Sequence, residues 1–447
     1  MNTESYQSEN QIRSAFSSAM SAMYRAEVPQ YASLCSLVES INEQEIKTKP
    51  EEYSSISNED LECERHGAIR LGTAKELSTM RRLFAVMGMF AVDYYDLSVA
   101  GIPVHSTAFR PIGLENIKEN PFRIFTSLLR LDLIEDEALR NTAEAVLSKR
   151  NIFSKHLVAL IESKEKHGGL TQQQSKQFVD EALEVFRWHQ EAQVDSQTYQ
   201  QLNATHRLIA DVVSFKGPHI NHLTPRTLDI DKVQKQLSKQ FKAKKFVEGP
   251  PRRKCPILLR QTSFIALEES VIFSDGQQGS HTARFGEIEQ RGLALTPKGR
   301  KLYDDLLTKA RQNKNNDYEK VLKKSFLKFP DNHQTLHDEE LAYYQYTAQQ
   351  TTDLKSDDLL SLNQLIEAGH LQITPIIYED FLPVSAAGIF SSNLSSDNNE
   401  KQIKQSPNQA SFEKALGASV IDSFTLYEKT QKVSLALALK DLGITVF

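Results

Sequence analysis

One order of predicted elements occurs twice in this chain of 447 residues, and it is the feature that most limits the possible folds. Each copy reads as a strand, a helix and two further strands, and each first strand carries histidine. The first copy consists of residues 64–72, 73–87, 90–98 and 102–109. The second consists of residues 218–224, a helix that opens at 229–233, and strands at 256–264 and 281–290. The two copies share this order without strong sequence identity.

This order predicts an α+β fold in one domain, residues 1–447, with sheet modules at about 62–112 and 217–292. Residues 121–213 contain few glycines or prolines and repeat apolar residues at helical spacing, so we expect an all-helical insertion packed on the sheet. Helices are also expected at the two ends of the chain and over much of 300–369. The remaining expectations are a helical region at 9–45, a strand at 371–378, a mobile loop at 391–409 and a helical end at 412–442.

The composition is that of an ordinary soluble globular protein, with 40% hydrophobic and 25% charged residues. The net charge of -5 leaves no basic footprint, so we expect no nucleic-acid partner. No apolar stretch approaches the length needed to span a membrane, and we expect a cytoplasmic protein. The three cysteines are far apart, which predicts free thiols. The sequence does not define an oligomeric state.

The segment 217–226 holds two histidines, His219 and His222, between prolines. Histidine is the commonest protein ligand for transition metals, although such a pair also occurs as packed side chains. In a strand, His219 and Asn221 would face one side, while Ile220 and His222 would face the other. We therefore expect only one of the two histidines to bind a metal, with partners from elsewhere in the chain.

His66 and Arg70 lie on the first predicted strand and share one face, because residues four apart in a strand point the same way. An arginine binds a carboxylate through two parallel hydrogen bonds. A metal ligand and a guanidinium in one cavity would suit a chelating, anionic substrate. The alternative is a pair of surface side chains.

Carboxylate ligands are available at Glu287 and Glu289, about 7 Å apart on one strand face. Periodicity does not choose between them. His281 is six residues from Glu287, roughly 20 Å along a continuous strand, which is too far to share its metal. Two histidines and one carboxylate form the facial triad of non-haem Fe(II) oxygenases, which leaves open positions for substrate and O2. Gly-rich nucleotide loops, a nucleophilic Gly-x-Ser-x-Gly and His-Glu-x-x-His are absent.

Several segments together resemble the 2-oxoadipate dioxygenase/decarboxylase family, over nearly the whole chain. The segments are residues 64–70, 104–110, 186–190, 217–226, 281–292 and 378–390. The resemblance implies a fold similar to the vicinal oxygen chelate enzymes, with a curved mixed sheet around a metal site. It also implies Fe(II) as cofactor and His66, His222 and Glu287 as its ligands. The family's substrate contacts fall on the side chain of Arg70 and the backbone amides of Val384 and Ser385.

The implied reaction converts 2-oxoadipate and O2 to 2-hydroxyglutarate and CO2, a late step of lysine breakdown. His105, Arg284 and Gln261 are our candidates for residues that contact and orient the metal ligands without binding the metal themselves. Two alternatives remain. One is a related oxygen-chelate dioxygenase that acts on a different 2-oxo acid. The other is a metal-dependent protein that binds an oxo acid without turnover.

Overall fold

The computed structural model describes residues 5–51, 61, 65–240, 247–264, 267–312, 318–349, 360–382 and 408–444. The chain divides into two compact units, which are described separately. The first unit comprises Met1–Glu248, Gln261–Glu289 and Pro383–Ile421. The second comprises Gly249–Arg260, Gln290–Leu382 and Asp422–Phe447. The expectation that residues 1–447 form one domain with two sheet modules therefore stays a prediction.

A five-stranded mixed sheet in the order β3-β4-β5-β2-β7 forms the centre of the first unit. Its central strand β2 pairs in parallel with β5 and antiparallel with β7. The other two pairings, β3 with β4 and β4 with β5, are antiparallel. The strands are β2 (His66–Leu71), β3 (Met89–Asp96), β4 (Val104–Pro111), β5 (Arg123–Leu129) and β7 (Leu223–Thr224). With α4 (Ala74–Val86) after β2, the predicted first strand-helix-strand-strand copy is confirmed.

The prediction that residues 121–213 are all helical is wrong, because the first part of this stretch forms strand β5. All seven residues of β5 are buried between β4 and β2. A strand covered on both faces does not show the alternating pattern that identifies a half-buried one. A second short strand, β6 (Leu170–Thr171), pairs with β1 (Tyr6–Gln7). The helices of this region are α5 (Leu114–Glu119), α6 (Glu137–Lys149), α7 (Lys155–His167), α8 (Gln172–Val185), α9 (Ser196–Thr205) and α10 (Arg207–Ser214), with single 3-10 turns η1 (Ser98–Ala100) and η2 (Leu131–Leu133).

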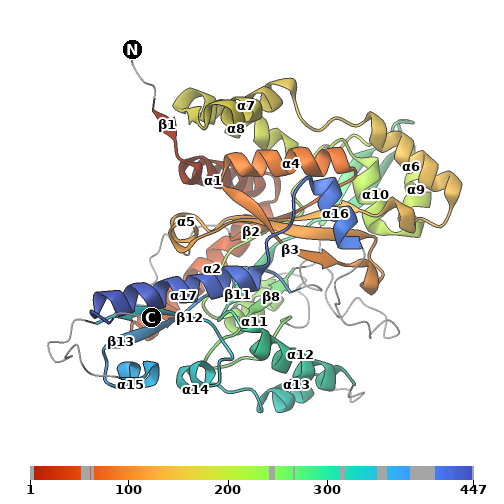
Figure 1. Cartoon of the computed structure of the whole chain (residues 1–447). Coiled ribbons are helices and arrows are strands. Elements are labelled where there is room, and N and C mark those ends of the chain that lie inside the picture. The colour runs from red at the N-terminus through yellow and green to blue at the C-terminus, as the bar shows by residue number, and fades with distance from the viewer. Residues whose placement is uncertain are drawn as a thin grey trace. The chain divides into compact units, whose positions relative to one another are not determined.

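Helices α1, α4, α7 and α8 lie together on one side of the five-stranded sheet (Figure 1). The predicted helical region 9–45 forms α1 (Glu9–Glu27) and α2 (Pro29–Thr48). Aromatic rings fill the space between helices and sheet: the rings of Phe16 and Phe186 are 5.4 Å apart, and those of Phe84 and Phe109 are 4.7 Å apart. Edge-on and tilted pairs at such distances add specific geometry to the hydrophobic burial that holds the layers together.

The second copy of the order is more divided than we predicted. Residues 281–290 form two strands, β10 (Gln278–Arg284) and β11 (Glu287–Arg291), because β10 pairs with β9 (Leu267–Ile272) whereas β11 pairs with β8 (Leu259–Ser263). The change of partner occurs at Gly286, where a Cβ would lie 2.1 Å from the ring of Phe264. The short β7 is followed by α11 (Ile230–Gln240), as expected. A parallel bridge between Arg226 and Glu289 joins the segment after β7 to β11.

Three backbone segments that carry the candidate ligands are tied to one another by hydrogen bonds. Asn221 N donates to Ala68 O of β2 at 2.9 Å, and Phe285 N donates to Asn221 O at 3.1 Å. The buried Tyr24 of α1 reaches both segments, since its hydroxyl lies 3.0 Å from Asn221 O and 2.7 Å from Phe285 O. At Gly67, a Cβ would lie 2.6 Å from the Ile220 side chain, so glycine permits this close approach.

The second unit contains a β-hairpin-like pair and several helices. Strand β12 (Tyr344–Ala348) pairs antiparallel with β13 (Leu371–Pro375), which confirms the strand predicted at 371–378 and interrupts the helical region predicted over 300–369. Its helices are α12 (Pro297–Gln312), α13 (Tyr318–Phe326), α14 (His333–Asp338), α15 (Leu362–Glu367) and α17 (Ser423–Asp441). Helix α16 (Asn408–Leu416) belongs to the first unit, and α16 and α17 confirm the predicted helical end. The loop predicted at 391–409 lies outside the described residues up to position 407.

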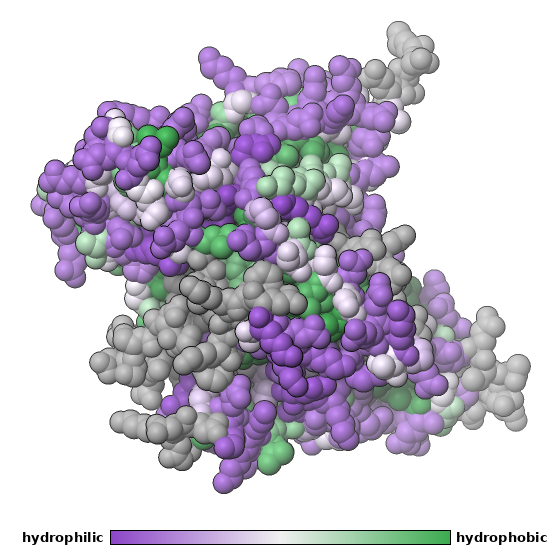
Figure 2. Space-filling model, turned by 180° about the vertical axis from the view of Figure 1, so that it is seen from behind, coloured by the Kyte–Doolittle hydropathy of each residue, from purple (hydrophilic) through white to green (hydrophobic). Residues whose placement is uncertain are grey.

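The surface of the described chain is mainly hydrophilic in the view of Figure 2, with hydrophobic side chains in small separate patches. Large exposed hydrophobic residues are scattered along the sequence, as Tyr6, Leu133 and Leu327 illustrate. None of the helices in the described ranges combines the length and the apolar character that crossing a membrane requires.

Removal of the Tyr24 hydroxyl by Tyr24→Phe should lower the free energy of unfolding by about 1–2 kcal/mol, because buried carbonyls lose a hydrogen-bond donor. Urea denaturation followed by circular dichroism measures this change. Tyr6→Phe is the matched control, since Tyr6 is 52% exposed, and it should leave stability unchanged. Equal stability of both variants would contradict the bridging role of Tyr24.

Candidate metal centre

Three buried residues from three separate segments converge in the first unit. His66 begins β2, His222 immediately precedes β7, and Glu287 begins β11. Their side chains are 1–3% exposed, and one ligand atom from each lies within 4.8 Å of the other two. In the part of the chain that the structure describes, this is the one cluster of His, Cys, Asp or Glu residues with such an arrangement. The structure thus brings together the three residues that the resemblance implied as ligands.

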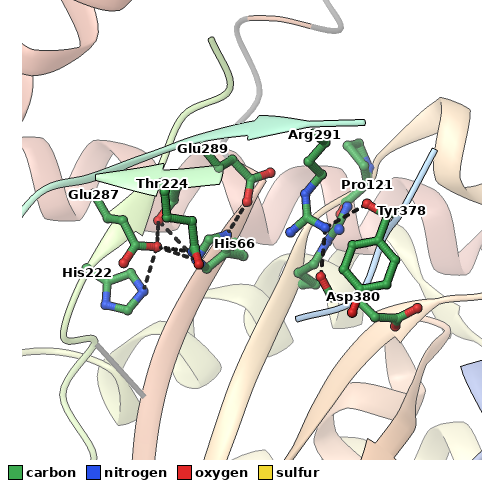
Figure 3. A network of polar contacts seen from close by, with 11 residues as sticks. His66, Pro121, His222, Thr224, Glu287, Glu289, Arg291, Tyr378 and Asp380 are labelled. Carbon is green, nitrogen blue, oxygen red and sulfur yellow. Dashed lines mark hydrogen bonds and ion pairs between the residues drawn. The ribbon is translucent and has the colours of Figure 1, made fainter. Parts of the chain in front are cut away.

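The imidazole of His66 lies between two carboxylates, as the dashed lines in Figure 3 show. Its Nδ1 is 2.8 Å from Oε2 of Glu289, and its Nε2 is 2.9 Å from Oε1 of Glu287. A proton on Nδ1 that is donated to Glu289 leaves the lone pair of Nε2 directed toward Glu287. This carboxylate-histidine arrangement fixes ring orientation and tautomer in metal sites. Periodicity did not distinguish Glu287 from Glu289, but in the structure the two glutamates contact different nitrogens of the His66 ring.

Glu287 has one satisfied oxygen and one free oxygen. Oε1 accepts hydrogen bonds from Nε2 of Gln261 at 2.6 Å and from Oγ1 of Thr224 at 3.2 Å. Oε2 is buried without a hydrogen-bond partner among the described residues, and so is Nδ1 of His222. Orphaned polar atoms are costly to bury, and a bound cation would compensate for them. The donor set therefore fits a metal ion.

Gln261 was a predicted supporting residue, and the structure places its side-chain amide on the candidate ligand Glu287. Thr224 was not predicted. The available signal was its position two residues after His222, which alternation places on the same side of the segment. His219, in contrast, packs edge-on against Trp188 with ring centroids 4.7 Å apart. His222 lies in the candidate metal cluster and His219 does not, as expected of the pair, although the predicted strand at 218–224 is limited to β7 and residues 218–222 lie outside it.

The pKa values of the clustered residues depend on two opposing effects: burial disfavours the charged forms, and neighbouring opposite charges favour them. Burial disfavours the charged form of His66, but the charge of Glu289 and the hydrogen bonds to both glutamates raise its pKa above the usual value. Burial lowers the pKa of His222 to about 4. For Glu287, burial works against ionisation, while the nearby His222 and His66 bring its pKa below the usual range. His222 and Glu287 therefore favour the neutral imidazole and the carboxylate that metal binding requires, whereas His66 would give up a proton when a metal binds.

Arg70 projects from β2 and forms an ion pair with a residue that the sequence analysis did not single out. Its Nη1 lies 2.7 Å from Oδ2 of Asp211 on α10. Both side chains are largely buried, with 12% and 5% of their surface exposed. Asp211 stands in an otherwise apolar helical segment, and a charge at such a position was the signal available in the sequence.

The remaining predicted residues lie elsewhere. The buried His105 packs against Tyr94 and Phe412, with ring centroids 6.0 and 4.8 Å away. Arg284 pairs with Glu269 at 2.9 Å and with Glu27 at 2.5 Å. A supporting role at the metal for these two residues stays a prediction. Val384 and Ser385 lie outside the described residues.

Figure 3 also draws contacts of Arg291, a residue of the second unit. Nη1 of Arg291 donates to the carbonyl oxygens of Tyr378 and Asp380 at 2.8 and 2.9 Å. The guanidinium also lies 5.6 Å from the ring centre of Phe381. These contacts hold the end of the described stretch 360–382.

The fold and the cluster define a class: an α+β protein with a buried site of two histidines and one carboxylate that could hold a metal, built on a mixed sheet. The α+β prediction is confirmed. Within that class, the chain belongs to the 2-oxoadipate dioxygenase/decarboxylase family, whose model matches residues 16–393.

Individual relatives agree with this assignment. A protein of Escherichia coli (strain K12) named 2-oxoadipate dioxygenase/decarboxylase is 52% identical over 436 residues, which is 95% of this chain and 97% of the relative. A Pseudomonas putida protein of the same name is 50% identical over 99% of each chain. The crystal structure of the Pseudomonas putida hydroxyglutarate synthase in complex with 2-oxoadipate is similar at a TM-score of 0.91, with 50% identity, 98% of this chain and 99% of that chain covered.

Replacement of Glu289 by glutamine should weaken metal binding by about 10- to 100-fold, because the amide is a poorer acceptor for the His66 ring. Competition with a chromophoric chelator measures the affinity. Glu268→Gln, an exposed glutamate on β9, is the matched control. An unchanged affinity in Glu289→Gln would mean that the contact with His66 does not tune the ligand.

Acid should destabilise the fold through His105. Burial and the nearby Arg130 lower its pKa from 6.5 to about 4, so the unfolded chain binds a proton between these values that the folded chain does not. Stability is therefore present above about pH 6.5 and falls toward pH 4, by up to about 3 kcal/mol from this ring. His105→Gln should show a shallower fall in urea denaturation between pH 7 and 4. Parallel pH curves for the two proteins would contradict this assignment.

Proposed function

We propose that this chain is an Fe(II)-dependent dioxygenase that converts 2-oxoadipate and O2 to 2-hydroxyglutarate and CO2. One O2 is consumed for each CO2 released: the C1 carboxylate leaves as CO2, the former keto carbon becomes a new carboxylate, and the second oxygen atom forms the hydroxyl group of the five-carbon product. The observation that carries the proposal is the buried cluster of His66, His222 and Glu287 in a chain so similar to a hydroxyglutarate synthase crystallised with 2-oxoadipate. Its place in lysine breakdown and its cytoplasmic location stay predictions.

The donor set supports the choice of Fe(II). Two imidazoles and one carboxylate that leave open positions are typical of non-haem Fe(II) oxygenases. His66, His222 and Glu287 would hold the ion, and the unpartnered Oε2 of Glu287 supports this role. When bound there, the metal supplies Lewis acidity and a template for the 2-oxo acid and O2.

The protein residues around the site would orient the substrate. His66 and Arg70 share one face of β2, and their Cα atoms are about 13 Å apart at the usual strand rise. A six-carbon diacid can extend from the metal toward the guanidinium, where Arg70 would bind the distal carboxylate through paired hydrogen bonds. The backbone amides of Val384 and Ser385 are proposed as a further substrate contact.

Burial of the site supports the same chemistry. His66, His222 and Glu287 are nearly inaccessible to solvent, as are Gln261 and Thr224 beside them. Exclusion of water strengthens each electrostatic interaction with the substrate and limits side reactions of activated oxygen. Glu289 and Gln261 hold His66 and Glu287 in place, so that both ligands are oriented before substrate arrives.

The direct experiment loads the protein with Fe(II) without air, adds 2-oxoadipate and O2, and follows dissolved oxygen and CO2 together. Wild type should consume O2 and release CO2 in equal amounts, with 2-hydroxyglutarate as the product. His222→Ala should abolish both signals because it removes a ligand, whereas the exposed His156→Ala should retain them. Iron content is measured in each protein.

If wild-type protein with verified iron content consumes no oxygen, the proposed reaction is wrong. Uptake without CO2 release from 2-oxoadipate would favour a related dioxygenase with another 2-oxo acid as substrate. Binding of 2-oxoadipate without any oxygen consumption would favour a binding protein.

A further inference from the structure

Asp211 is a fully enclosed carboxylate at the centre of a polar network that lies outside the metal cluster. It is 5% exposed and sits on α10 between apolar residues such as Ile209 and Val213. An ionised carboxylate in such surroundings is strongly disfavoured unless cationic or N–H groups compensate for the lost water. The structure supplies two groups that hydrogen-bond Asp211, Arg70 and His281, and places the ring of His219 close by.

The two carboxylate oxygens of Asp211 contact different residues. Oδ2 faces Nη1 of Arg70 at 2.7 Å. Oδ1 lies 2.8 Å from Nε2 of His281 and 3.2 Å from Nε2 of His219. Burial opposes ionisation, yet the charges of His219 and Arg70 hold the pKa of Asp211 well below its usual range. A charged Asp211 therefore receives Arg70 on one side and histidine on the other.

The histidine side of the network is rigid. The hydroxyl of Tyr199 lies 2.8 Å from Nδ1 of His281, so both ring nitrogens of His281 have partners. Trp188 lies parallel to the His281 ring and edge-on to the His219 ring, with centroids 6.4 and 4.7 Å away. Phe215 packs against His281 at 4.9 Å. Asp211 consequently has little freedom to follow Arg70 if the arginine moves.

The Arg70 side of the network leaves donors for a ligand. Within the described part of the chain, Nη1 makes the one hydrogen bond of this guanidinium. The five N–H groups of arginine lie in a fixed plane, so an anchor at Nη1 also sets the direction of Nε and Nη2. Arg70 is on the same strand face as His66, and its charge is among those that act on the pKa of buried His222, after burial and the charges of Glu287 and His66.

We propose that Asp211 is a positioning residue that aims Arg70 at the distal carboxylate of the substrate, and that the network Tyr199-His281-Asp211-Arg70 thereby sets the preference for diacids. The inference rests on the proposed function, because it takes a 2-oxo diacid as the ligand. An anchored guanidinium loses little freedom when it binds a carboxylate, whereas an unanchored one must be ordered at that moment.

The test compares two ligands that differ only at the far end: 2-oxoadipate and 2-oxohexanoate, which has the same chain length without the distal carboxylate. Anaerobic calorimetry on Fe(II)-loaded protein gives both dissociation constants without turnover. Asp211→Asn should reduce the preference for 2-oxoadipate by about tenfold, the size expected for a misdirected charge-assisted hydrogen bond. Binding of 2-oxohexanoate should stay within about twofold of wild type.

Further variants separate positioning from a general structural effect. Arg70→Ala should lose the preference, and Asp211→Asn added to it should change nothing more, because Asp211 acts through Arg70. Tyr199→Phe, which leaves Asp211 intact, should lower the preference by a smaller factor and keeps the test available if Asp211→Asn does not fold. Glu76→Gln, in the similarly buried pair of Glu76 with Arg150, is the matched control and should preserve the preference.

Three results would overturn the inference. An equal loss of affinity for both acids in Asp211→Asn would show a structural role alone. An unchanged preference would show that Arg70 needs no anchor. Tighter binding of 2-oxoadipate would show that Asp211 competes with the substrate for Arg70. Because calorimetry requires no reaction, a failure of the proposed dioxygenase activity would be seen separately, in the oxygen and CO2 measurements.

Discussion

A buried imidazole between two carboxylates is the interaction on which the site depends. His66 contacts Glu287 through one nitrogen and Glu289 through the other, at 2.9 and 2.8 Å. Such a contact is favourable only where the strands that carry these residues keep a fixed register. The backbone meets this need, since β2 pairs with β7 and the segment after β7 bridges to β11. The strand pairing therefore brings the candidate metal ligands together, and the contacts between their side chains in turn stabilise the correct pairing.

Much of the fold was predictable where pattern and physics coincide. Thr73 caps α4 by accepting from Glu76 N at 3.1 Å, and the apolar stripe that follows reads plainly as a helix. Strand β5 escaped prediction because all of its residues are buried and it lacks alternation. The break between β10 and β11 escaped because a change of strand partner is a tertiary event that local sequence does not encode.

The site shows the same division. Alternation around Ile220 separated His219 from His222, and the structure places the two rings in different surroundings. Periodicity could not choose between Glu287 and Glu289 for a physical reason: both glutamates face the same His66 ring. Asp211 is 141 positions from Arg70, and no rule of spacing connects a strand residue to a helix residue at that distance. Only the assembled chain brings that pair together.

The distance in sequence between the ligands has a consequence for how the protein reaches its active form. His66 and Glu287 are 221 positions apart, so no partial chain that lacks the late strands presents the whole donor set. A metal that binds only the assembled cluster stabilises the folded state by mass action, increasingly as its free concentration exceeds the dissociation constant. The concentration of free metal would then set how much of this protein stays folded, in addition to how much of it holds a complete site.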